Sequence, residues 1–294
     1  MLTLFRRVRD ARRGAIRARQ VASINAILSA KATPDTRRSE ADFESLQNSY
    51  QPRPEYGYSS LSLFERAANR ATQVLKRVPP GNRTLRFLDV GAGDGMLGVL
   101  FAAAGHDVTL CDLEDWRTNS AKGLRFIAAD CCVGLPRHAD EFDLVCSFNS
   151  FEHFVDPSRA FAEMLRVTAP GGLIYLDFGP LYCSPWGLHA YRSLRMPYPQ
   201  FLFSPTFTSA KLKKLGVFDL GKSRNELQNL NRWKFQEFAA VWNCAKTEII
   251  ASHLISDEKQ LNIIVEYPEC FRGRGLSFQD VTCSNVIIVL KKRI

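Results

Sequence analysis

The chain has 294 residues, enough for one large domain or one domain with extensions, and its apolar content of 46% and charged content of 23% are ordinary for a soluble globular protein. It has no run of about 20 apolar residues, which argues against an integral membrane protein. The eight cysteines include no C-x-x-C pair, which argues against a cysteine-bound zinc site or a disulfide framework and favours a reducing compartment.

The net charge of +9 is concentrated at the amino terminus. Residues 1–40 hold ten basic and three acidic residues, a net charge of +7, so residues 41–294 carry only +2. A nearly neutral main body does not favour nucleic acid as a partner. Residues 1–31 have the pattern of a basic helix, with Leu2, Phe5 and Val8 three residues apart. Three interpretations of this helix stay open: a solvated helix, a helix bound to an anionic membrane surface, and an organelle transit segment.

The elements that follow indicate an α/β protein. Residues 32–55 are polar with little periodic pattern, which predicts a linker. A helix is expected at 59–77, with Leu61, Phe64, Ala68 and Val74 on its apolar face. Strands and helices then alternate, which predicts a doubly wound, mostly parallel sheet with helices on both faces. Strands are expected at 84–90, 107–112, 124–130, 142–147 and 171–178, and the main helices at 96–105 and 156–168, the latter capped by Asp156 with Pro157 at its first position.

The alternation breaks at residues 179–230, where five prolines punctuate an aromatic-rich stretch, so a lid-like insertion is expected there. After it, we expect a helix at 234–242, a strand at 247–254, a helix at 257–267 and a final strand at 284–292. The chain is therefore divided into a basic helical arm with a linker (1–56), a ligand-binding core (57–178), the insertion (179–230) and the remaining part of the sheet (231–294).

Three glycines follow the first strand in "FLDVGAGDGMLG" (87–98). Glycines after a buried strand let the backbone turn sharply and let a ligand approach the main chain. A dinucleotide fingerprint would place a small residue at the position of Met96, and the Lys-Ser/Thr pair of a phosphate-binding loop is absent. Asp89 and Asp94 would repel a pyrophosphate but suit a cationic amine.

Two further acids end the next strands. Asp112 can accept hydrogen bonds from both hydroxyls of a ribose, and Asp130 can accept one from the exocyclic amine of an adenine. A ligand with an amine, a ribose and an adenine but no phosphate suits all these acids, and S-adenosylmethionine is such a ligand. The alternative is that the acids only cap their loops.

The sequence resembles the class I S-adenosylmethionine-dependent methyltransferases over about residues 57–178, and more loosely to residue 294. The motifs that carry the resemblance are "LDVGAGDG" (88–95), "LCD" (110–112), "AAD" (128–130), "FDLVCSFNSFEHFVDP" (142–157) and "LRVTAPGGLIYLD" (165–177). The resemblance implies a seven-stranded Rossmann-like sheet with an antiparallel final strand. It also implies cofactor contacts at Asp89 and the turn of Gly91, Gly93 and Gly95 near the methionine moiety, at Asp112 and Leu113 near the ribose, at Asp130 and the Cys131 backbone near the adenine, and at Phe148.

Three residues are candidates for catalysis. "FNSFEHF" (148–154) resembles the E-x-x-E-H run of quinone-pathway O-methyltransferases, but Asn149 replaces the first acid, so no metal ligand is assigned. Glu152 and His153 either lie near the reaction or only support the loop. His189, in the insertion, is a second candidate base. The aromatic residues around it, Trp186, Tyr191, Tyr198 and Phe201, either line a pocket for the acceptor or form plain packing.

The preferred hypothesis is a methyltransferase that acts on an oxygen atom of a small-molecule, sugar or lipid-linked acceptor. The alternatives are an RNA or protein methyltransferase and, in another class, a binding or assembly protein with a degenerate methyltransferase fold. "FNSFEH" stands where methyltransferases of planar nitrogen atoms carry an N-P-P-Y type of run, which disfavours the RNA alternative. The expected location is cytoplasmic, with residues 1–31 at a membrane surface; the mitochondrial matrix is the alternative.

Overall fold

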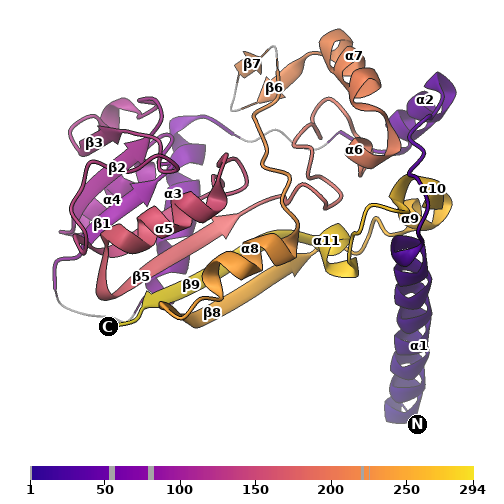
Figure 1. Ribbon diagram of the computed structural model, residues 1–294, viewed down its shortest axis with the longest axis horizontal. Helices are drawn as coiled ribbons and strands as arrows, with labels where there is room; N and C mark the ends of the chain where they lie inside the picture. The colour runs from indigo at the N-terminus through magenta and orange to yellow at the C-terminus, as the bar shows by residue number, and fades with distance from the viewer. Residues whose placement is uncertain (1, 53–56, 79–82, 220–221, 225) are drawn as a thin grey trace.

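The computed structural model of the protein describes residues 2–52, 57–78, 83–219, 222–224 and 226–294. A sheet with helices on both faces occupies one end of the molecule (Figure 1). A smaller group of short helices, joined to the projecting helix α1 (Leu2–Ser29), occupies the other end.

The sheet has seven strands in the order β3-β2-β1-β4-β5-β9-β8. β9 pairs antiparallel with both β5 and β8, and the other pairs are parallel. The mostly parallel sheet with an antiparallel final strand is therefore confirmed. The strands are β1 (Arg86–Val90), β2 (Asp107–Asp112), β3 (Arg125–Ala128), β4 (Phe142–Phe148), β5 (Thr168–Phe178), β8 (Thr247–Ser256) and β9 (Cys283–Lys292).

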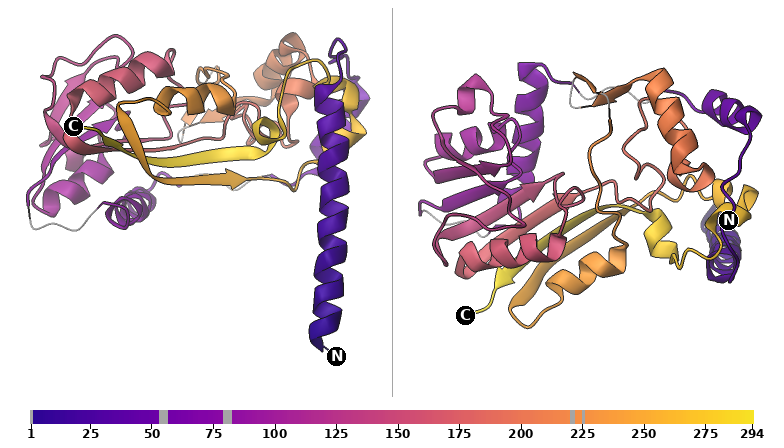
Figure 2. Two further views of the ribbon diagram at one scale, coloured as in Figure 1. Left: turned by 60° about the horizontal axis from the view of Figure 1, so that its bottom comes forward. Right: turned by 45° about the horizontal axis from the view of Figure 1, so that its top comes forward.

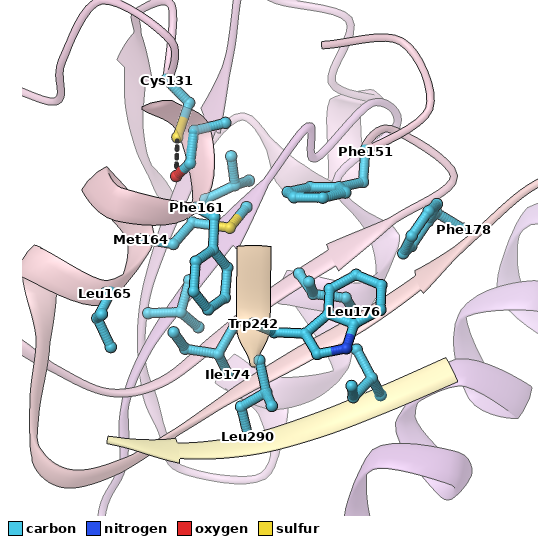
Figure 3. Packing of buried hydrophobic residues seen from close by; sticks show 14 of the residues in the cluster. Cys131, Phe151, Phe161, Met164, Leu165, Ile174, Leu176, Phe178, Trp242 and Leu290 are labelled. Atoms are coloured by element: carbon cyan, nitrogen blue, oxygen red, sulfur yellow. Dashed lines mark hydrogen bonds between the residues drawn. The ribbon is translucent and has the colours of Figure 1, made fainter. Parts of the chain in front are cut away.

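Helices cover both faces of the sheet. On one face α5 (Pro157–Val167) and α8 (Phe235–Trp242) pack through Phe161, Met164 and Trp242 (Figure 3). On the other face α3 (Ser60–Leu75) and α4 (Met96–Ala103) pack against a second core. Every residue of the central strand β4 is buried, because a parallel strand between two helical layers meets apolar side chains on both sides.

Local sequence signals explain the helix boundaries. Asp156 caps α5 by accepting a hydrogen bond from the Arg159 N–H at 3.0 Å, and Pro157 begins the helix, as predicted. The apolar face predicted for α3 is partly wrong, since Leu61 and Phe64 are 66% and 47% exposed. Val74 is buried as predicted, Ala68 is half-buried, and Ala67 is buried as well, where α3 packs against α4.

The second group of helices, which we call the helical lobe, draws on three distant parts of the chain. Its shared core contains Ile24, Leu28, Phe43, Phe203 and Phe271. The lobe comprises α2 (Glu40–Ser49), α6 (Pro199–Leu202), α7 (Pro205–Leu215), α9 (Asn262–Glu266), α10 (Pro268–Phe271) and the last turns of α1. The remaining elements are the 3₁₀-helix η1 (Asn119–Ala121), the paired short strands β6 (Val217–Asp219) and β7 (Lys222–Arg224), and the helix α11 (Phe278–Thr282).

The segment expected to be a linker contains α2. Ser39 and Asp42 form a capping box at its start, and Phe43 packs edge-on against Phe203 with ring centroids 5.6 Å apart. The Gln47 amide donates to the Ser193 carbonyl at 2.8 Å and accepts from the Arg195 N–H at 2.9 Å. Residues 40–49 are thus fixed to the insertion. The helix expected at 257–267 is also shorter than predicted, since α9 covers only Asn262–Glu266.

Helix α1 projects from the helical lobe (Figure 2). Ile24 and Leu28 are buried in the lobe, whereas residues 14–20 are exposed. One side of the helix is also fixed, because Arg17 donates two hydrogen bonds to the Glu258 carboxylate. In the part of the chain that the structure describes, no helix combines the length and the apolar character needed to cross a membrane.

Candidate functional site

The glycine turn joins β1 to α4 at the carboxyl edge of the sheet. Gly91, Gly93 and Gly95 have φ values of 74°, 52° and 74°, which glycine adopts without strain. A Cβ on Gly91 would lie 2.2 Å from Ser150 Oγ, so this position is closely packed. A Cβ on Gly93 would meet nothing within 4 Å. The main chain at Gly93 is therefore open to a ligand.

Asp112 lies beside this turn, at the end of β2. Its carboxylate accepts hydrogen bonds from the Gly93 N–H at 2.9 Å and from the Leu113 N–H at 2.7 Å. Burial raises the pKa of Asp112, and these backbone hydrogen bonds oppose the rise. Each carboxylate oxygen has two lone pairs, so after these two bonds both oxygens keep acceptor capacity for a ligand.

Asp130 and Cys131 follow β3. Asp130 Oδ1 accepts a hydrogen bond from the Cys132 N–H at 2.8 Å. The Cys131 thiol is buried and lies 3.5 Å from the Ala160 carbonyl oxygen, so the side chain belongs to the core and only its backbone is a candidate contact (Figure 3). Two large apolar side chains next to these acids face solvent, Leu113 with 67% and Val133 with 85% of its surface exposed.

Asp89 is the third acid, near the end of β1, and it is buried. Burial raises its pKa to about 7, and the Asp94 and Asp112 carboxylates act in the same direction, whereas the Arg70 guanidinium opposes them. A buried carboxyl with such a pKa would be stabilised in its ionised form by a cation. Asp89 therefore fits a ligand that brings a positive charge to this edge.

A cavity of about 540 Å³ lies between α3 and the ends of β4, β5 and β9. Phe148 from its lining stacks on Tyr175, and the Arg70 guanidinium lies 4.9 Å from the centroid of the Phe148 ring. Arg66 also lines the cavity and forms an ion pair with Asp94 at 3.7 Å. Neither arginine was predicted from the sequence. The sequence does show that Arg66 and Arg70 lie four residues apart on the helix before the first strand, a spacing that places both side chains on one face of the helix.

Glu152, His153 and His189 come together, although 36 residues separate the second from the third. One ligand atom of each residue lies within 4.8 Å of the others. Glu152 and His153 lie in the turn after β4, and His189 lies in the insertion after β5. Glu152 Oε1 accepts a hydrogen bond from the Gly179 N–H at 3.1 Å, which ties the cluster to the end of β5. We call these three residues the Glu–His–His cluster.

The aromatic residues around His189 do not form an open pocket. Trp186, Tyr198 and Phe201 are 7%, 0% and 4% exposed. The Tyr198 hydroxyl donates to the Val281 carbonyl at 2.8 Å, and the Trp186 Nε1–H donates to Asp257 at 3.0 Å. Trp186, Tyr198 and Phe201 are therefore packing residues, because the insertion builds the helical lobe, whereas Tyr191 is half-buried and its place at an acceptor pocket stays a prediction.

The fold and this edge together define a class of protein. A sheet of the order described, with a glycine turn after β1 and an acid near the carboxyl end of each of β1, β2 and β3, has the architecture expected of a class I methyltransferase. The acids lie where ligands bind in doubly wound sheets.

Comparison of the sequence with a family model and with curated proteins also identifies a methyltransferase domain. Residues 88–176 match the family model described as "Methyltransferase domain". A 2-methyl-6-phytyl-1,4-hydroquinone methyltransferase of Oryza sativa subsp. japonica is 32% identical over 46% of this chain and 42% of its own. A methyltransferase of Mycolicibacterium vanbaalenii is 36% identical over 36% of this chain and 43% of its own. The solved PH0226 protein of Pyrococcus horikoshii has a TM-score of 0.49 and 15% identity, over 82% of this chain and 96% of that one.

Residues 88–176 thus form a methyltransferase domain with the sheet order expected of the class I fold, and these matches support S-adenosylmethionine as the cofactor. The chain spans less than half the length of the curated relatives that it matches.

Proposed function

We propose that the protein transfers the methyl group of S-adenosylmethionine to an oxygen atom of a small-molecule, sugar or lipid-linked acceptor. The observation that carries the proposal is the placement of Asp89, Asp112 and Asp130 near the carboxyl ends of β1, β2 and β3, with Asp112 bonded to the open backbone of Gly93. A degenerate, non-enzymatic protein would not need to keep this set of acids.

Each acid has a distinct role in this proposal. Asp112 accepts hydrogen bonds from the ribose hydroxyls, and Asp130 with the Cys131 backbone contacts the adenine, whose faces Leu113 and Val133 cover with apolar surface. Asp89 stabilises the cationic methionine end. Phe148 lines the neighbouring cavity, into which the methionine end extends.

The Glu–His–His cluster acts on the acceptor. Bound S-adenosylmethionine supplies an activated methyl group on a sulfonium, so the chain mainly has to align the acceptor and remove its hydroxyl proton. The His153 Nδ1 lies 2.7 Å from the Asn229 carbonyl, which only accepts hydrogen bonds, so Nδ1 carries the hydrogen and Nε2 is the basic nitrogen. His153 or His189 would take the proton.

The nature of the acceptor rests on the relatives. The name of the rice relative gives a phytyl-substituted hydroquinone as its acceptor, a small ring with phenolic hydroxyls and a long apolar tail. An acceptor of this kind supports the small-molecule or lipid-linked part of the proposal. Mass spectrometry of small molecules, lipids, RNA and protein from cells with and without the gene tests the nature of the acceptor. A methyl group that is missing only from RNA or protein in cells without the gene would favour the alternative of an RNA or protein methyltransferase.

Calorimetry tests the cofactor site. Asp112→Ala should weaken S-adenosylmethionine binding by about 1.5–3 kcal/mol, the value of hydrogen bonds to a charged group. Asp107→Ala is the matched control, because Asp107 is the first residue of the same strand and lies at its opposite end. If the folded Asp112→Ala protein binds S-adenosylmethionine as tightly as the natural protein does, the ribose is contacted by another residue.

The basic arm leads to a proposed location. Residues 14–20 project from the body with Arg17 and Arg19 exposed, and residues 1–20 contain seven of the ten basic residues of the arm. Each Lys or Arg near an anionic bilayer contributes about 1 kcal/mol. The arm would hold a cytoplasmic enzyme reversibly at an anionic membrane, where a lipid-linked acceptor is found. Cleavage of the arm in cells would favour transit to the mitochondrial matrix instead.

A further inference from the structure

Two arginines that come from different parts of the chain gather around Tyr182, in the insertion. We propose that Arg232, Arg274 and the Tyr182 hydroxyl bind a phosphate group of the methyl acceptor and so position the acceptor at the Glu–His–His cluster. The role of this site rests on the proposed methyl transfer, but the binding of a phosphate does not.

The first argument is the arrangement of charges and rings. The Arg232 guanidinium carbon lies 5.5 Å from the centroid of the Tyr182 ring, and the Arg274 guanidinium carbon lies 4.9 Å from that of Phe201. The two rings meet edge-on, with centroids 6.2 Å apart. Burial raises the pKa of Tyr182, and both guanidinium charges oppose this rise. The Tyr182 hydroxyl therefore lies in the field of both cations.

The second argument is the supply of hydrogen-bond donors. Among the described residues, the Arg232 guanidinium and the Tyr182 hydroxyl make no hydrogen bond, and neither arginine forms an ion pair. Arg274 donates through Nε to the Cys270 carbonyl at 2.6 Å and through Nη2 to the Phe201 carbonyl at 3.5 Å, which leaves its Nη1 hydrogens available. Guanidinium groups stay charged in proteins, and phosphate oxygens are acceptors that match their geometry.

The acids of this region do not neutralise the two arginines. The Glu237 carboxylate accepts a hydrogen bond from the Lys234 N–H at 2.7 Å, at the start of α8. The Asp280 carboxylate is buried and accepts one from the Phe235 N–H at 2.8 Å. Lys234 adds a third positive charge, and its Nζ donates to the Arg274 carbonyl at 3.3 Å. A phosphate with two negative charges would balance the arginines.

Arg232 is fixed beside His153. The Asn229 carbonyl lies 2.7 Å from His153 Nδ1, and the Asn231 amide donates to the Phe151 carbonyl at 2.9 Å. These contacts hold the segment before Arg232 against the turn after β4. Arg232 itself has a φ of 61°, which is strained for a residue with a Cβ. Strain of this kind is concentrated at binding and catalytic sites.

Tyr182 is fixed beside His189. The Pro180 carbonyl, two residues before Tyr182, lies 2.7 Å from His189 Nε2. The His189 and His153 rings meet edge-on with centroids 5.0 Å apart. Arg232 and Tyr182 thus belong to segments that each hold one of the two histidines. A phosphate bound at these residues would keep the rest of the acceptor next to the histidines.

The segment of Arg274 is also joined to the basic arm. The Gly273 N–H donates to the Ala30 carbonyl at 3.0 Å, just after α1. An arm that binds an anionic membrane would therefore bring this site close to lipid headgroups. Two sources supply a phosphate of the required kind, a phosphorylated lipid and a water-soluble phosphorylated compound, and the experiment below distinguishes them.

Calorimetry of the full-length protein tests the site. The probes are octyl phosphate below its micelle concentration, inorganic phosphate, and octyl glucoside, which has the same tail without the phosphate. Salt is added to screen the exposed arm. We expect one octyl phosphate per chain and no binding of octyl glucoside. Arg232→Gln and Arg274→Gln should each weaken phosphate binding at least about tenfold, and Tyr182→Phe by less.

Arg125→Gln is the matched control for the loss of one positive charge. Arg125 is exposed on β3, at the end of the molecule away from the helical lobe (Figure 1), so its replacement should leave phosphate binding unchanged. Arg232 is also exposed, so Arg232→Gln carries the test even if Arg274→Gln fails to fold. An equal effect of Arg125→Gln, or no saturable binding of either phosphate, would overturn the site.

The remaining outcomes identify the source of the phosphate and separate this inference from the proposed function. Tighter binding of octyl phosphate than of inorganic phosphate supports a lipid phosphate, and equal binding supports a water-soluble phosphorylated acceptor. Failure to bind S-adenosylmethionine would overturn the methyltransferase proposal and leave the phosphate result valid. A methylated acceptor that carries no phosphate, identified by mass spectrometry of cells with and without the gene, would overturn the role of the site.

Discussion

Replacing Asp89 by asparagine should stabilise the free protein at high pH. Burial raises the pKa of Asp89 from 3.8 to about 7, so the folded state holds a proton that the unfolded state releases. The associated stability is fully present below pH 3.8 and is lost as the pH rises through 7. The difference of about three pKa units corresponds to about 4 kcal/mol. Asp89→Asn, which stays neutral, avoids this loss.

Urea unfolding at several pH values between 4 and 8 measures the effect. The stability of Asp89→Asn relative to the natural protein should grow by up to about 4 kcal/mol over this range and then level off. Asp143→Asn is the control with the opposite sign. Burial acts to raise the pKa of Asp143, but hydrogen bonds from Arg86 bring it below its usual range, so this carboxylate stabilises the fold at neutral pH. Its replacement should therefore destabilise the protein as the pH rises.

The same carboxyl should control cofactor affinity. If the cationic methionine end binds the ionised form of Asp89, affinity falls below pH 7 by up to about tenfold per pH unit. Asp89→Asn should bind S-adenosylmethionine more weakly at pH 8 and lose this pH dependence. A stability difference between Asp89→Asn and the natural protein that is the same at pH 4 and pH 8 would refute the reasoning, because it would mean that Asp89 titrates as an ordinary exposed acid.

Three further predictions concern other parts of the molecule. His189→Ala should lower turnover by about 10²–10⁴-fold, measured at saturating acceptor, while calorimetry shows unchanged affinity for S-adenosylmethionine. Gly91→Ala should lower the free energy of unfolding by about 1–3 kcal/mol more than Gly105→Ala, since both have positive φ but only Gly91 is closed off, by Ser150. Deleting residues 1–20 should abolish binding to anionic vesicles in sedimentation assays, binding that high salt also weakens; equal partition of both proteins would contradict this.

The sheet could be predicted because its signals are local. Each strand from β1 to β5 is a short apolar run, and α4 and α5 lie between such runs with a glycine or a cap at an end. The acids Asp89, Asp112 and Asp130 could be found because the carboxyl ends of parallel strands meet at one edge of the sheet. Position along the chain was enough to place these three residues.

The helical lobe could not be predicted because its partners are far apart in the sequence. Phe43 in α2 looks like an isolated ring in a polar segment until Phe203 and Phe207 from the insertion pack against it, each with centroids 5.6 Å away. The Glu–His–His cluster could not be predicted from the sequence for the same reason. Glu152 and His153 were visible as a pair, but only the folded insertion brings His189 beside them.

The basic arm and the candidate catalytic residue His189 are not in independent parts of the molecule. Ile24 and Leu28 of α1 share the core of the helical lobe with residues of the insertion that carries His189. The chain just after α1 is also fixed, since the Gly273 N–H donates to the Ala30 carbonyl at 3.0 Å. A deletion of residues 1–40 would open this core and disturb His189, whereas a deletion that ends at residue 20 leaves the packed turns in place. Only the shorter deletion can separate attachment to a membrane from the chemistry of the site.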